Sequence, residues 1–254
     1  MIRCNFELSN YSKNIIIKPI DDIITYEYKI ESHLGHGTIG NVYLLDNKKY
    51  VIKISKKECE DELIYELEMF KNKLKKNNEN ERIFPIFYGN FKNSKKFGIV
   101  YNYLGKYNFD DFKLKHYNLL SFKNNITIIK QIITQLISFD NIIHCDLKSS
   151  NIIIDIKANS LLATIIDLGL SSLVIPDRKV LSTNYITSPE SLLTLKEYYK
   201  CVVNQDDLSM KKHDYFGLFT FVLNLFSKEN YWYILNKYLT KDKKINQDFL
   251  LEQK

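Results

Sequence analysis

The sequence predicts an α+β fold with a small β-rich first part and a mostly helical second part. Three short segments with strand composition open the first part: residues 28–34, 41–46 and 49–54. In the second part, apolar residues recur at helical spacing over residues 121–139, so they share one helix face. Residues 215–226 are strongly apolar, as in a helix that is buried on most sides.

This order of sheet first and helices later indicates two lobes, which we expect to join near residues 103–107. We therefore divide the chain into a lead-in (1–25), an N-terminal lobe (26–103) and a C-terminal lobe (104–254). The remaining expected elements are a helix over 58–76, strands over 84–91, 97–103, 151–155 and 162–166, and a last helix over 230–239.

Composition narrows the class of protein. The chain has 254 residues, of which 45% are hydrophobic, which is enough for a packed core and too many for a disordered chain. The net charge of +6 is mild, and no aromatic ladder interleaves the lysine runs, which disfavours nucleic-acid binding. The four cysteines form no C-x-x-C pair, so neither a zinc site nor a disulfide framework is expected. No apolar stretch approaches the ~18 residues of a membrane span. These features predict a soluble, cytoplasmic protein.

A glycine-rich segment lies between the first two predicted strands. It places Gly35, Gly37 and Gly40 in the pattern G-x-G-x-x-G. Because glycine has no Cβ, such a segment lets the backbone close over phosphate groups. The same pattern occurs in dinucleotide-binding folds, where a helix follows it. Here a second strand follows, which favours a phosphate-binding hairpin.

Lys53 lies inside an apolar predicted strand, where a charged side chain needs a partner. Phosphate oxygens or a carboxylate on the next helix would serve, and a solvent-facing lysine is the plain alternative. The helix offers three candidate carboxylates, Glu62, Glu66 and Glu68.

The strongest signal is the run His144-Cys145-Asp146-Leu147-Lys148-Ser149-Ser150-Asn151, which fits the pattern H-R-D-L-x-x-x-N. Downstream, Asp167-Leu168-Gly169 stands where D-F-G is expected, and Ser188-Pro189-Glu190 replaces A-P-E. With the glycine-rich segment and Lys53, these motifs follow the order and the approximate spacing of one family. Over about residues 28–226, the chain resembles the eukaryotic-type protein kinases.

The resemblance implies a bilobal protein kinase fold with ATP and Mg²⁺ in the cleft between the lobes, Mn²⁺ being the alternative ion. Asp146 would accept or orient the proton of the substrate hydroxyl, and Lys148 would neutralise charge on the transferring phosphoryl group. Asn151 and Asp167 would hold the metal ion.

Further positions follow from the same resemblance. The family register favours Glu66 as the partner of Lys53, with Glu62 and Glu68 as alternatives. Thr183 would contact the catalytic aspartate and lysine, which indicates transfer to serine or threonine of a protein substrate. Asp214 resembles the aspartate that braces the catalytic loop. The residues expected to contact the nucleotide are Leu34, Gly35, Gly37, Gly40, Val42, Val51, Lys53, Tyr101, Tyr103 and Ile153.

Within the family, the hinge sequence Tyr103-Leu104-Gly105 and the short strand loops are similar to the casein-kinase-1/VRK branch and to the compact kinases of poxviruses. A viral member would act in the cytoplasm of the host cell.

The sequence departs from the family pattern at two places, and each departure leads to a further expectation. Cys145 replaces an arginine that pairs with a phosphate on the activation segment, so activity is expected without an activating phosphate. Only 40 residues follow Asp214, so we expect a C-terminally shortened C-lobe. The shortening supports an alternative function, a kinase mimic (pseudokinase) that catalyses little and modulates a partner protein bound at this lobe.

Overall fold

The computed structural model divides the chain into two compact units. Unit 1 comprises Met1–Gly105 and Ile166–Gly169, and unit 2 comprises Lys106–Ile165 and Leu170–Lys254. The structure describes residues 4–8, 14–19, 26–37, 39–45, 48–74, 85, 87–92, 97–139, 142–157, 160–173 and 207–227. The helix predicted over residues 230–239 lies outside these residues.

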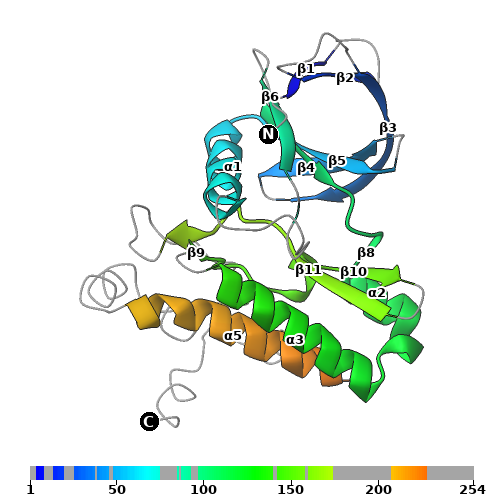
Figure 1. Cartoon of the computed structure of the whole chain (residues 1–254), viewed down its shortest axis with the longest axis vertical. Coiled ribbons are helices and arrows are strands. Elements are labelled where there is room, and N and C mark those ends of the chain that lie inside the picture. Colours follow the sequence, from blue (N-terminus) through cyan, green and yellow to red (C-terminus); the bar gives the residue numbers. More distant parts are fainter. Residues whose placement is uncertain are drawn as a thin grey trace, which may run out of the picture. The chain divides into compact units, whose positions relative to one another are not determined.

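Unit 1 is built on one antiparallel sheet of seven strands in the order β1-β2-β3-β4-β5-β7-β6. The strands are β1 (Cys4–Leu8), β2 (Asn14–Pro19), β3 (Tyr26–His36), β4 (Gly40–Leu45), β5 (Tyr50–Ser55), β6 (Phe87–Lys92) and β7 (Phe97–Asn102). The sheet curls strongly, so that its two edge strands, β1 and β6, lie side by side (Figure 1). The curvature follows from the twist that every strand carries.

The first two strands lie in residues 1–25, which the sequence analysis described as a lead-in and for which it predicted no strand. β1 pairs with β2, and β2 pairs with the first half of β3 over residues 26–29. The second half of β3 pairs with β4. β3 is therefore longer than its apolar pattern predicts, because its two halves have different partners.

One helix, α1 (Glu60–Leu74), packs on this sheet. Its first turn is acidic, which suits the positive end of the helix dipole. Leu63, Leu67 and Phe70 are buried at helical spacing, and the ring of Phe70 lies 6.4 Å from that of Tyr101 on β7. This packing fixes the buried side of α1 against the strand next to β5.

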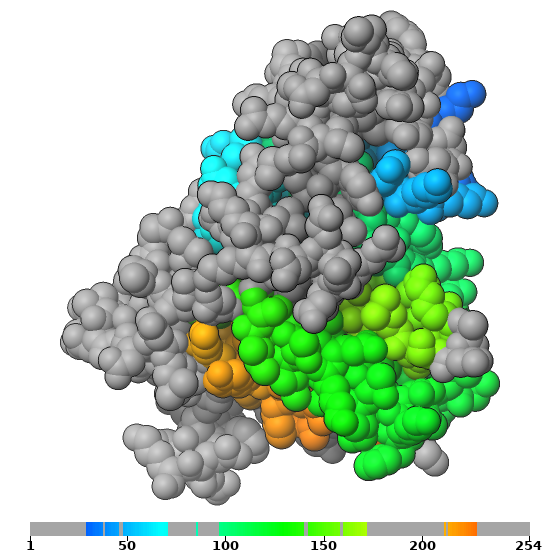
Figure 2. Space-filling view, viewed as in Figure 1, coloured from blue at the N-terminus to red at the C-terminus, as the bar shows by residue number. Residues whose placement is uncertain are grey.

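Unit 2 is mostly helical, which confirms the predicted α+β class. Its helices are α2 (Phe109–His116), α3 (Phe122–Ser138) and α5 (Asp207–Phe226), with short 3₁₀ turns η1 (Tyr117–Leu119) and η2 (Ser149–Asn151). Its strands are β8 (Tyr107–Asn108), β9 (Ile142–Ile143), β10 (Ile152–Lys157), β11 (Ser160–Ile165) and β12 (Ser172–Leu173). α3 and α5 lie side by side, and their side chains adjoin on one face of the unit (Figures 1 and 2).

The sequence analysis did not predict α2. The helix has only eight residues, too few for a clear periodicity. Its start is nevertheless marked in the sequence, because the Asn108 side chain accepts a hydrogen bond from the Asp111 backbone N–H, at 2.8 Å. An N-cap followed by acidic residues in the first turn is the signal that would have found it.

Two glutamines of α3 complete the hydrogen bonding of β11. Gln131 donates to the Leu161 carbonyl at 3.1 Å and accepts from the Ala163 N–H at 2.7 Å. Gln135 donates to the Ala163 carbonyl and accepts from the Ile165 N–H, both at 2.8 Å. The two side-chain amides act as a neighbouring strand would, and so satisfy backbone groups along the edge of the sheet. They hold the strand that leads directly to Asp167.

Candidate active site

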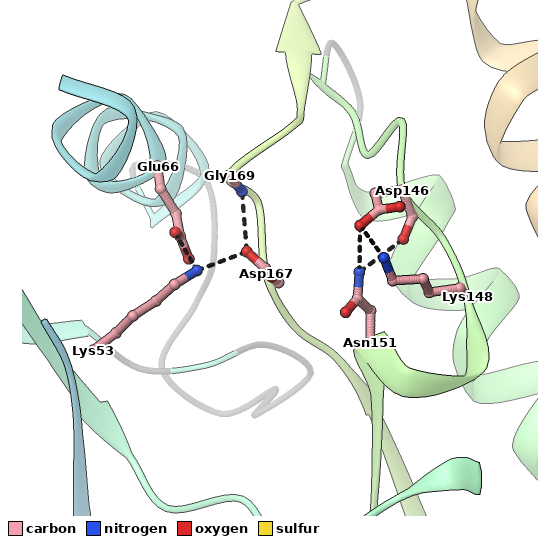
Figure 3. Close-up of polar contacts among 7 residues, drawn as sticks. All are labelled: Lys53, Glu66, Asp146, Lys148, Asn151, Asp167 and Gly169. Carbon is pink, nitrogen blue, oxygen red and sulfur yellow. Dashed lines mark hydrogen bonds and ion pairs between the residues drawn. The ribbon is translucent and has the colours of Figure 1, made fainter. Parts of the chain in front are cut away.

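In unit 1, Lys53 is bonded to two carboxylates that come from distant parts of the chain. Its ammonium group donates to Glu66 Oε2 at 2.6 Å and to Asp167 Oδ1 at 2.7 Å (Figure 3). Lys53 projects from β5 and Glu66 from α1, and Asp167 follows β11. Of the three candidate glutamates, Glu66 is the one bonded to Lys53, whereas Glu62 and Glu68 are exposed.

Burial and charge oppose one another in this cluster. Burial alone would lower the pKa of Lys53, but Asp167 and Glu66 outweigh it and raise that pKa. Burial raises the pKa of Glu66 to about 7, against the opposing effect of Lys53. The Leu168 backbone N–H also donates to Glu66. Burial likewise raises the pKa of the Tyr101 phenol, so Tyr101 is neutral beside the ammonium group.

Asp167 has a backbone φ of 68°, in the left-handed region that non-glycine residues rarely adopt. Its carboxylate accepts from Lys53 and, at 3.4 Å, from the backbone N–H of Gly169 (Figure 3). Strained backbone of this kind persists where the surroundings over-determine it, and it clusters at functional sites.

Four residues expected to contact a nucleotide share one face of the unit 1 sheet. Val42 pairs with Gly35 on β3 and with Lys53 on β5, and Val51 pairs with Tyr101 on β7. Directly opposite residues of an antiparallel pair point to the same face, as do alternate residues of one strand. Val42, Val51, Lys53 and Tyr101 therefore share the face that α1 reaches.

The glycine-rich hairpin joins β3 to β4. Its turn is closed by the Gly37 N–H, which donates to the Gly40 carbonyl at 2.8 Å. A Cβ on Gly40 would lie 2.6 Å from the carbonyl oxygen of Ile54, so only glycine lets β4 approach β5 this closely. The requirement at Gly40 is therefore one of close backbone packing.

The other residues expected at the nucleotide are more scattered. Leu34 is 40% exposed near the end of β3. The backbone N–H of Tyr103 donates to the Lys49 carbonyl at 2.7 Å. Ile153 belongs to unit 2, where it pairs with Thr164 on β11.

In unit 2, Asp146, Lys148 and Asn151 form a second charged cluster within one loop. Asp146 Oδ2 accepts from Lys148 Nζ at 2.7 Å and from Asn151 Nδ2 at 2.9 Å (Figure 3). Asn151 Nδ2 also donates to the Asp146 backbone carbonyl at 2.9 Å. Asp146 and Asn151 are 5% and 6% exposed, so their positions are set by these contacts rather than by water.

The start of this loop is held by Asp214 at the N-terminal side of α5. Its carboxylate accepts from the backbone N–H groups of His144 and Cys145, at 2.8 and 3.0 Å. Cys145 has a φ of 62°, and the two bonds stabilise this left-handed backbone. The His144 ring accepts from the Asp146 N–H at 3.2 Å. Burial raises the pKa of Asp214, against the opposing effect of His144.

Thr183 and the segment Ser188–Glu190 lie outside the described residues. In the part that the structure describes, the sequence analysis missed a polar group beneath the loop that involves Lys113, Ser149 and Asn224. The sequence gives part of the signal, because Asn224 is a polar residue in the strongly apolar stretch 215–226 and needs buried partners there, but it does not say which residues these are.

One comparison with known proteins gave a match for most of the chain. A family model described as "Protein kinase domain" matches residues 28–253. A comparison with curated proteins gave no match. Among the described helices, none combines the length and the apolar character needed to cross a membrane.

Proposed function

The chain belongs to the protein kinase family, and from this premise we propose that it transfers the γ-phosphoryl group of ATP to serine or threonine hydroxyls of proteins. One observation carries the proposal: both charged clusters are complete. Lys53 is bonded to Glu66 and Asp167 in unit 1, and Asp146 is bonded to Lys148 and Asn151 in unit 2. A protein that only bound a partner would not need all of these contacts.

The proposed chemistry is positioning combined with charge stabilisation, because phosphoryl transfer needs little covalent work from the protein. Asp146 would accept or orient the proton of the attacking hydroxyl. Lys148 and Asn151 donate to the same carboxylate oxygen, Oδ2, and so hold the carboxylate in one orientation. Lys148 would also offset negative charge on the transferring group, and Lys53 would bind phosphate oxygens.

The residues present fit a magnesium ion that arrives with a nucleotide. Asn151 Nδ2 is bonded to Asp146, so the amide oxygen is the atom left to face a cation. The side chain of Asp167 is 29% exposed, with one oxygen bonded to Lys53. No described group of three or more His, Cys, Asp or Glu side chains forms a metal cage. Magnesium is commonly bound by one or two protein oxygens together with substrate phosphates. When bound, it would neutralise charge on those phosphates.

Serine/threonine specificity is proposed from Lys148, which the resemblance associates with this class. The contribution of Thr183 stays a prediction. Cytoplasmic action is likewise proposed, and Cys59 and Cys145, neither of which is part of a disulfide, agree with a reducing compartment.

The test is a phosphotransfer assay with radiolabelled ATP, Mg²⁺ or Mn²⁺, and a panel of generic protein substrates, with Asp146→Asn as the inactive control. We expect label on protein, and phosphoserine or phosphothreonine after acid hydrolysis. Mainly phosphotyrosine would contradict the residue specificity. ATP with Mg²⁺ should also raise the melting temperature, because a ligand that binds only the folded state stabilises it. Absence of both transfer and stabilisation would favour a kinase mimic.

A further inference from the structure

We propose that Asn224 of α5, together with Lys113 and Asp110 of α2, is a positioning residue for phosphotransfer that acts through Ser149. Ser149 lies in the same loop as Asp146 and Asn151. The inference rests on the proposed function, because that proposal assigns the residues that Asn224 would position.

The side-chain amide of Asn224 connects three elements of unit 2. Its Nδ2 donates to Ser149 Oγ at 2.7 Å and to Asp110 Oδ1 at 3.3 Å. Its Oδ1 accepts from Lys113 Nζ at 3.0 Å. Both ends of the amide are therefore engaged, and the residue is 0% exposed. A buried amide with every partner present fixes its neighbours in one arrangement.

Lys113 has a second role in the same group. Its Nζ also donates to the backbone carbonyl of Asn224. This carbonyl is among the last four of α5, which have no partner within the helix. A cation at this end also suits the helix dipole. Lys113 is 8% exposed, and Asp110 on the same helix supplies the nearby negative charge. The bonds that Asn224 makes with Lys113 and Asp110 thus hold the end of α5 against α2.

One side of α5 contacts the loop His144–Asn151, the proposed catalytic loop, at three successive places. Asp214 binds the backbone at His144 and Cys145. A Cβ on Gly217 would lie 2.7 Å from the Leu147 carbonyl oxygen, so helix and loop are in direct contact there. Asn224 binds Ser149. These three helix positions fall within one side of the helix at 100° per residue.

The order of these contacts gives the functional consequence. Asp214 holds the loop before Asp146, and Asn224 holds it between Lys148 and Asn151. Ser149 begins the 3₁₀ turn that carries Asn151, and Asn151 donates to Asp146. Without the contact to Asn224, the turn would lose its only described anchor on α5. Asn151 and Asp146 would then be less well oriented, which lowers the rate of transfer more than nucleotide affinity.

The experiment compares Asn224→Leu and Ser149→Ala with Thr220→Val. Thr220 is a matched control, because it is buried on the same helix and, among the described residues, its hydroxyl donates within the helix, to the Gly217 carbonyl at 2.9 Å. For Asn224→Leu and Ser149→Ala we expect kcat to fall about tenfold, with the KM for ATP changed much less. Thr220→Val should keep kcat within about twofold of the wild type.

Hydrogen exchange gives a readout that does not depend on activity. The backbone amides of residues 146–151 should exchange about tenfold faster in Asn224→Leu than in Thr220→Val. Should Asn224→Leu fail to fold, Ser149→Ala, which removes one hydroxyl, decides the matter. An unchanged kcat in folded Ser149→Ala, or an equal loss in Thr220→Val, would overturn the proposal. If the wild type itself transfers no phosphate, the proposed function fails, while unchanged exchange at 146–151 would reject the positioning role separately.

Discussion

The Lys53 cluster of unit 1 joins side chains from three distant segments, whereas the Asp146 cluster of unit 2 forms within a single loop. Lys53 lies 13 residues from Glu66 and 114 residues from Asp167 in the sequence. Asp146 and Asn151 are only five residues apart. The first cluster therefore needs the tertiary fold before any contact exists, whereas the second needs only a correctly held loop.

The two clusters also differ in how they carry charge. One buried ammonium serves two carboxylates in unit 1, so each charge there depends on the others for compensation. In unit 2, backbone N–H groups and side-chain amides hold the loop, through Asp214 and Asn224. We infer that substitutions in the Lys53 cluster affect both stability and activity, whereas those in the Asp146 cluster affect activity alone.

Lys53→Met is expected to have the largest effect, because it removes the one cation of the cluster. Glu66 and Asp167 would then face each other without compensation, which should lower the free energy of unfolding by about 3 kcal/mol. Phosphotransfer should fall roughly 10³-fold, since the proposed donor to the phosphate oxygens is lost. Urea unfolding and the radiolabel assay measure the two effects. Lys57→Met, at an exposed turn lysine, is the control. If Lys53→Met lost activity but kept the wild-type free energy of unfolding, it would contradict the inference that this cluster contributes to both stability and activity.

Asp146→Asn is expected to lower phosphotransfer about 10³-fold by removing the proposed proton acceptor. The free energy of unfolding should change by less than about 1 kcal/mol, since the amide keeps the shape and an oxygen acceptor for Lys148. Asp155→Asn is the matched control, because Asp155 on β10 also pairs with a lysine, Lys157, at 2.6 Å. Its activity should match that of the wild type. A large loss of stability in Asp146→Asn would show that the loop cluster is structural after all.

The same contrast explains what the sequence could predict. The residues of the loop from His144 to Asn151 are contiguous, so their spacing alone indicates the cluster. The partner of Lys53 could not be identified from spacing alone, because the choice among three glutamates depends on which side of α1 is buried. Glu66 shares the buried stripe with Leu63 and Phe70, whereas Glu68 lies about 200° around the helix from it.

Other features could not be read from a single segment. The strands β1 and β2 depend on pairing with the first half of β3, and their composition alone does not specify that pairing. The bond from Asn224 to Ser149 joins positions 75 residues apart, and the bond to Lys113 spans 111. No local motif marks these contacts, because each depends on how α2 and α5 pack in unit 2.

The pH dependence of the free energy of unfolding tests the contribution of the buried Glu66 carboxylate in unit 1. Burial raises the pKa of Glu66 from its ordinary value of 4.5 to about 7. Between these pH values the folded protein binds more protons than the unfolded chain, so this group's contribution to stability falls as pH rises. Glu66→Gln cannot titrate, so the stability of the wild type relative to this variant should decrease by up to about 3 kcal/mol from pH 4.5 to 7. Urea unfolding at a series of pH values measures the slope.

Glu68→Gln is the control for this slope. Glu68 lies on the same helix but is exposed, so this variant controls for the loss of one carboxylate from α1. Parallel pH curves for the wild type and Glu66→Gln would mean that the pKa of Glu66 is the same in the folded and the unfolded protein, which would contradict the prediction.

Removal of phosphate from the protein is expected to have the smallest effect. In the kinases that the chain resembles, an arginine beside the catalytic aspartate pairs with a phosphate on the activation segment. Cys145 occupies the position of this arginine. Cys145 is 4% exposed, and its N–H is bonded to Asp214. It offers no cation, and charge-assisted pairing is what such a phosphate needs in order to hold a segment. The loop is anchored by α5 instead, so phosphatase treatment should leave kcat within about twofold of the untreated enzyme.

Cys145→Arg supplies the missing cation and should make activity depend on phosphate. If phosphatase abolished wild-type activity and rephosphorylation of Ser182, Thr183 or Thr187 restored it, the loop would depend on more than its α5 anchors. Arg178 and Lys179 would then be the cations to mutate first.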